Sequence, residues 1–114
     1  MTAITIGFPY LGTIGKPATL ELSKEPVKLL TRRIGSGEEQ IWHLDGPNKG
    51  FWVDKNNKKI DSSNFIFKPP GTLIIKEVTS RDGGHYDFEP LVPSGKVINE
   101  NTDIKGIHLH LPEN

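Results

Sequence analysis

Residues 72–88 read TLIIKEVTSRDGGHYDF, and this stretch decides the fold. In its first part Leu73 and Ile75 lie on one face of an extended chain and Ile74 on the other. In its last part Tyr86 and Phe88 alternate with polar residues. A period of two is typical of a β-strand, and the residues between the two runs favour a turn. The stretch therefore predicts two strands joined by a tight connection.

Similar short runs occur along the whole chain. We expect strands at 4–7, 18–22, 41–44, 51–53, 65–67, 72–78, 86–88 and 107–111, with 27–30 either a further short strand or a packed loop. The 12 glycines and 9 prolines supply turns and argue against long helices. Seven to nine short strands predict a single all-β domain over residues 1–114, with the strands in a two-sheet antiparallel sandwich or a barrel.

The pattern Asp82-x-Gly84-x-Tyr86 resembles the E–F corner of the immunoglobulin superfamily, where a Leu-x-Ile strand precedes Asp-x-Gly-x-Tyr-x-Cys. Phe88 stands where that cysteine would be. Residues 15–22 resemble strand B of the same family, with Leu22 in place of the other cysteine. The resemblance implies an immunoglobulin-like sandwich without a disulfide. It also implies that the hydroxyl of Tyr86 bonds to backbone a few residues upstream.

The family also carries a tryptophan between its sheets, and this chain offers two candidates. Trp42 is followed by Asp45 and Gly46, as in the family's Trp-x-x-Asp-Gly pattern, although it lies farther from Leu22 than usual. Trp52 lies farther still, and we therefore favour Trp42. The residues expected to define the core of the fold are Leu22, Trp42, Leu73, Asp82, Gly84, Tyr86 and Phe88.

Composition narrows the class of protein. Lysine plus arginine number 14 and aspartate plus glutamate number 14, so no net charge attracts the chain to nucleic acid or to an anionic membrane. The N-terminal residues lack a basic region and a long apolar run, so we expect no leader and no membrane span. With no cysteine, the chain suits a reducing, cytoplasmic environment. Among immunoglobulin domains it is similar in kind to the intracellular I-set domains of muscle and cytoskeletal proteins.

No enzyme motif is present: the chain has no Gly-x-Ser-x-Gly, no phosphate-binding loop and no His-Glu-x-x-His. We expect no catalysis and no cofactor. The leading hypothesis is a protein-binding or scaffolding module with a protein partner. The alternative is a self-assembling, filament-associated protein, because a neutral chain with alternating terminal strands at 4–7 and 107–111 is suited to edge-to-edge addition.

Three histidines give a weaker hypothesis of a metal site. His108 and His110 share one face of a strand, and His85 lies on the strand that we expect beside it. Imidazoles that converge from adjacent strands can bind zinc or copper. The other interpretation is that both C-terminal histidines face solvent while Ile107 and Leu109 face the core.

Two features point to a surface for a partner. Phe51 and Trp52 are neighbours in a strand, so one of them must face outward, and an exposed aromatic side chain can anchor an interface. Trp52 is our candidate for this role; the alternative is that a neighbouring loop covers the outward aromatic ring. Lys55, Lys58 and Lys59 form a basic cluster that is either a solvated hairpin tip or a contact for an acidic partner.

Overall fold

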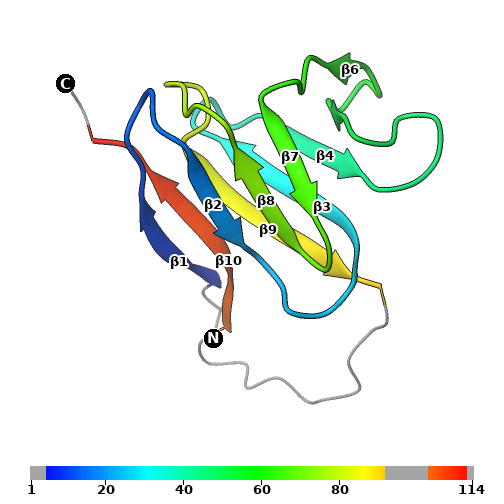
Figure 1. Ribbon diagram of the computed structural model, residues 1–114, viewed down its shortest axis with the longest axis horizontal. Helices are drawn as coiled ribbons and strands as arrows, with labels where there is room; N and C mark the ends of the chain where they lie inside the picture. Colours follow the sequence, from blue (N-terminus) through cyan, green and yellow to red (C-terminus); the bar gives the residue numbers. More distant parts are fainter. Residues whose placement is uncertain (1–4, 92–102, 113–114) are drawn as a thin grey trace.

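The computed structural model describes residues 5–91 and 103–112 (Figure 1). Ten strands are formed by these residues: β1 (Thr5–Leu11), β2 (Ala18–Glu21), β3 (Val27–Ile34), β4 (Glu39–His43), β5 (Trp52–Val53), β6 (Lys59–Ile60), β7 (Phe65–Lys68), β8 (Thr72–Ile75), β9 (Gly84–Pro90) and β10 (Asp103–His110). Within the described ranges, no helix is long and apolar enough to cross a bilayer. Ile4, expected in the first strand, lies outside them.

The strands form two sheets. The seven-stranded sheet has the order β1-β10-β9-β3-β4-β5-β6, and the three-stranded sheet has the order β2-β8-β7. In Figure 1 the small sheet lies against one face of the large sheet. The predicted all-β, two-sheet sandwich is confirmed. One detail differs, because β1 pairs with β10 in parallel whereas the sequence predicted antiparallel strands throughout.

The main correction concerns β3. The sequence left 27–30 open between a short strand and a loop, but β3 extends to Ile34 and pairs with both β4 and β9. Its inner face carries Leu30 and Arg32, both buried. Because Arg32 is charged although it occupies a core position, the sequence of β3 does not show a regular alternation of apolar and polar residues. Trp42 consequently lies on β4, with β3 between β4 and β9, and the extra strand explains its long separation from Leu22 in the sequence.

A single core fills the space between the sheets. Of the seven residues expected to define it, Leu22, Trp42, Leu73, Asp82 and Tyr86 are buried. Phe88 is partly buried and packs against the same apolar cluster, which includes Leu22.

Gly84, the seventh residue of that set, is required by backbone geometry. It has φ +150°, and a Cβ atom built there would lie 2.1 Å from the carbonyl oxygen of Arg33 on β3. Any side chain at this position would force the two strands apart, so the glycine of the motif permits β9 to pair closely with β3.

Both tryptophans face the core and touch the opposite sheet. Trp42 and Trp52 are directly paired across β4 and β5, with ring centroids 5.5 Å apart. Their centroids lie 6.2 and 5.8 Å from that of Phe65 on β7. Trp52 is 0 % exposed, so its assignment as a partner contact is wrong. The outward neighbour is Phe51, which is 38 % exposed.

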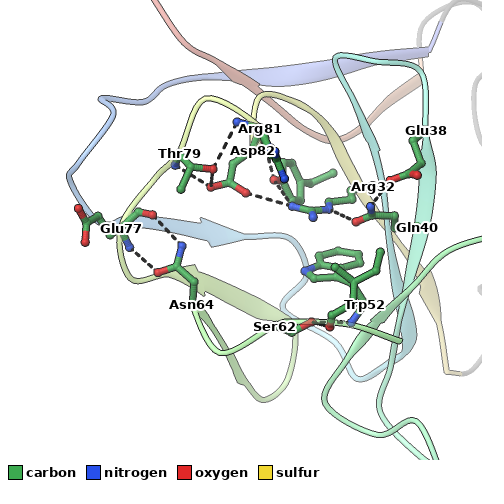
Figure 2. A network of polar contacts seen from close by, with 12 residues as sticks. Arg32, Glu38, Gln40, Trp52, Ser62, Asn64, Glu77, Thr79, Arg81 and Asp82 are labelled. Carbon is green, nitrogen blue, oxygen red and sulfur yellow. Dashed lines mark hydrogen bonds and ion pairs between the residues drawn. The ribbon is translucent and has the colours of Figure 1, made fainter. Parts of the chain in front are cut away.

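A buried polar network joins β3, β4 and β9 beside these rings (Figure 2). Arg32 Nη1 lies 3.3 Å from Asp82 Oδ1 and donates to the Tyr86 hydroxyl at 3.1 Å, while its Nε donates to Gln40 at 2.7 Å. The guanidinium carbon is 4.6 Å from the ring centroid of Trp52, a cation–π contact. Every member of the network is buried, so removing one partner would leave others unsatisfied.

The tyrosine corner predicted from the motif is present. The Tyr86 hydroxyl donates to the backbone oxygen of Asp82 at 2.6 Å. The Asp82 carboxylate in turn accepts the backbone N–H and the hydroxyl of Thr79, at 2.8 and 3.0 Å. Burial raises the pKa of Tyr86 to about 12, although the positive charge of Arg32 acts in the opposite direction.

We predict that Trp52→Ala lowers the free energy of unfolding by about 3–5 kcal/mol, at least as much as Trp42→Ala. Trp52 has the more extensive contacts, since it also packs on Tyr86 with ring centroids 6.2 Å apart. Chemical denaturation of both variants measures this. A clearly smaller loss for Trp52→Ala would restore Trp42 as the principal tryptophan between the sheets.

We predict an alkaline loss of stability that depends on Tyr86. Its pKa is higher when folded than the ordinary value near 10, so the stabilisation is complete below pH 10 and is lost as the pH rises towards 12. The loss should amount to about 2–3 kcal/mol. Denaturation between pH 8 and 12 measures it: the stability gap between wild type and Tyr86→Phe should narrow, whereas Tyr10→Phe should keep the wild-type decline.

Candidate functional site

The outer face of the large sheet is hollowed across β3, β4, β5 and β9. The hollow has a volume of about 730 Å³. It is lined by Thr31, Arg32, Arg33, Glu39, Gln40, Ile41, Val53, Asp54, Lys55, His85 and Asp87. Most of these residues alternate with core residues, so their side chains face away from the small sheet.

Strand pairing brings the lining residues together from distant parts of the chain. Thr31 pairs with Ile41, Ile41 with Val53, and Val53 with Lys59, which forms one row across four strands. Asp87 extends this row on the other side of Thr31. The row runs from a carboxylate on β9 to an ammonium group on β6.

The middle of this row is apolar. Ile41 is 39 % exposed, whereas Val53 beside it is only 3 % exposed although it faces outward from the sheet. Ile41 and Val53 together form an apolar surface in the centre of a polar face, and a partner protein could pack against it.

The carboxylates of the hollow already have partners. Glu39 forms an ion pair with Arg33, and Asp87 lies 3.8 Å from Nε2 of His85. The Asp54 carboxylate accepts the backbone N–H groups of Asn56 and Lys58, at 2.8 and 3.0 Å. These acidic groups are therefore engaged within the chain.

The three lysines of the predicted basic cluster lie between the end of β5 and β6. Lys55 lines the hollow, Lys58 lies in the turn after β5, and Lys59 is on β6. We call them the basic hairpin. In the part of the chain that the structure describes, no ion pair includes any of them. The Lys59 amino group lies 5.1 Å from the ring centroid of Phe51, within reach of a cation–π interaction.

The basic hairpin is fixed to the core by Ser62, which is buried. The Trp52 backbone N–H donates to the Ser62 hydroxyl at 2.9 Å, and this hydroxyl donates to the Ile60 oxygen at 2.8 Å (Figure 2). Beyond β6, hydrogen bonds from the backbone and side chain of Ser63 lower the pKa of Asp61. The Ser62 hydrogen bonds hold the backbone that follows the basic hairpin against β5.

The structure brings only part of the predicted histidine cluster together. His85 and His108 are direct partners across β9 and β10, with ring centroids 6.4 Å apart. His110 lies two positions farther along β10 on the same face. Over residues 5–91 and 103–112, no group of three or more His, Cys, Asp or Glu side chains is arranged to hold a metal ion.

The lysines and His85 were identified from the sequence, but the centre of the hollow was missed. Ile41, Arg33 and Val53 were not singled out, because the pairing of β3 with β4 was not foreseen. One signal was available: if Trp42 faces the core, period two places Ile41 outward. Comparison of the chain with protein-family models and with curated proteins finds no match.

Proposed function

We propose that this chain is a non-catalytic protein-binding module that receives its partner on the hollowed outer face of the large sheet. The observation that carries the proposal is the exposed Ile41 at the centre of a hollow with a polar rim. Interfaces commonly place apolar anchors in the middle and charged groups around them. Of the ionisable groups of the hollow, Glu39 is paired with Arg33, and we assign no chemistry to these groups.

The order of the strands supports membership of the immunoglobulin superfamily. In variable-type domains, strands G, F, C, C′ and C″ form one sheet and strands B, E and D belong to the other. The orders β10-β9-β3-β4-β5 and β2-β8-β7 correspond to these two sets. The arrangement favours the variable type over the I-set domains that the sequence indicated. A cytoplasmic location stays a prediction from the absence of cysteine.

The alternative of a filament protein loses support from the pairing of the terminal strands. β10 lies between β1 and β9, so it offers no free edge. Among the described strands β1 is at the edge of its sheet, but Gly12 donates its N–H to His110, and alternation then places the nitrogen of Pro9 on the outer side. Proline has no N–H to donate there, which weakens strand addition.

We predict a monomer in sedimentation velocity across a range of protein concentrations, unchanged by added zinc. Assembly without metal would contradict the monomeric binding module and favour the filament hypothesis. Assembly only with zinc would instead favour a site at His85 and His108.

A selection from a random peptide library tests the binding face directly. Selected peptides should shift the amide NMR signals of β3, β4, β5 and β9. Their affinity should fall about tenfold or more in Ile41→Asp, because a charge replaces an apolar anchor at the centre of the interface.

Ile66→Asp is the matched control. Ile66 is 40 % exposed, like Ile41, but lies on β7 in the small sheet. The Ile66→Asp substitution should leave the affinity for the selected peptides within about twofold of the wild-type value. Peptides that bind elsewhere, or that lose equal affinity in both variants, would contradict the proposed face.

A further inference from the structure

The basic hairpin identifies the kind of partner that the hollow accepts. We propose that the partner presents an acidic segment that also contains aliphatic residues, and that its acidic side chains lie against Lys55, Lys58 and Lys59. This inference rests on the proposed function and deepens it.

The first argument is the imbalance between engaged and free charges. Glu39 of the hollow forms an ion pair with Arg33, and the carboxylates of Asp54 and Asp87 accept backbone N–H groups. The lysines of the basic hairpin are in none of the ion pairs of the described chain. Along the chain the three lysines of the basic hairpin stand between Asp54 and Asp61, so this segment carries one more positive than negative charge. Complementary charge on a partner would steer its approach and set its orientation.

The second argument is the apolar surface next to these charges. Ile41 and Phe51 are exposed: Ile41 belongs to the row that ends at Lys59, and the Phe51 ring lies next to the Lys59 amino group. Lysine stems can cover apolar surface while their ammonium groups remain in water. A purely acidic segment would leave this surface uncovered, whereas a segment with interspersed aliphatic residues would bury it.

The third argument is the length and direction of the row from Asp87 to Lys59. Neighbouring strands lie about 4.8 Å apart, so a row across β9, β3, β4, β5 and β6 spans roughly 19 Å. An extended segment of about six residues covers that length. The acidic part of the segment belongs at the β6 end, because the row ends at Lys59 on β6 and at the carboxylate of Asp87 on β9.

A nucleic acid fits this surface less well. Phosphodiester binding depends on neutralising several phosphates with a stripe of cations. Here Glu39, Asp54 and Asp87 line the same hollow as the cations and would oppose a continuous anionic backbone. A peptide can place its acidic residues at one end only.

The test uses three fluorescent peptides of about ten residues that have leucines at the same positions. All other positions are Glu in the first peptide, Gln in the second and Lys in the third. Fluorescence anisotropy on the full chain should give an affinity for the Glu peptide at least about tenfold higher than for the other two. That preference should shrink between low and high salt, because screening weakens contacts between exposed charges. Amide shifts should place the Glu peptide on β4, β5 and β6.

Two triple variants locate the effect. K55Q/K58Q/K59Q should lower the affinity for the Glu peptide about tenfold or more, and K16Q/K24Q/K76Q, which removes three exposed lysines elsewhere, should leave it within about twofold. Equal affinity for the Glu, Gln and Lys peptides, no binding of the Glu peptide, or an equal loss in both triple variants would overturn the proposal. The proposal would also be overturned if a short single-stranded DNA displaced the Glu peptide and bound the chain with an affinity similar to that of the Glu peptide.

The two proposals fail separately. If library peptides bind at Ile41 but are neither acidic nor sensitive to the three lysines, the inference about acidic segments is wrong and the binding face stands. If the Glu peptide needs the lysines but not Ile41, and binds away from β3 and β4, the proposed face itself is wrong.

Discussion

The buried charge of Arg32 is the constraint on which the rest of the structure depends. A guanidinium inside a small core is tolerated only when its donors are satisfied, and here Asp82, Tyr86 and Gln40 provide the acceptors. Arg32 lies on β3, Gln40 on β4, Tyr86 on β9 and Asp82 in the connection into β9. Breaking such a network by removing one partner leaves a buried charge without compensation, so the network fixes the mutual position of three strands.

The same strand serves the core and the outer face. Arg32 faces inward to the network, while its neighbours Thr31 and Arg33 line the hollow. Because alternate residues of a strand point to opposite faces, fixing Arg32 in the core also fixes its neighbours on the surface. The tryptophan pair acts similarly on the adjacent strands, since an inward Trp42 and Trp52 place Ile41 and Val53 outward. A rigid face with a preformed hollow needs little ordering when a partner binds.

The charges of the outer face divide between two roles. Acidic groups are engaged within the chain, through Arg33 and through backbone N–H groups. The lysines at one end remain available to solvent and to a partner. A neutral molecule can therefore present a directional surface, because recognition depends on the local field and not on the net charge.

The sequence by itself determined the class of fold, the corner at Asp82, Gly84 and Tyr86, and the absence of a disulfide, because these follow from local alternation and from a motif of fixed spacing. It did not reveal β3 as a central strand, since Arg32 reads as a surface residue until its partners 50 and 54 positions away are known. It also placed Trp52 outside instead of Phe51. The hollow was decided by tertiary structure alone: strand register joins Ile41, Val53 and Asp87, and no short-range pattern records which strands pair.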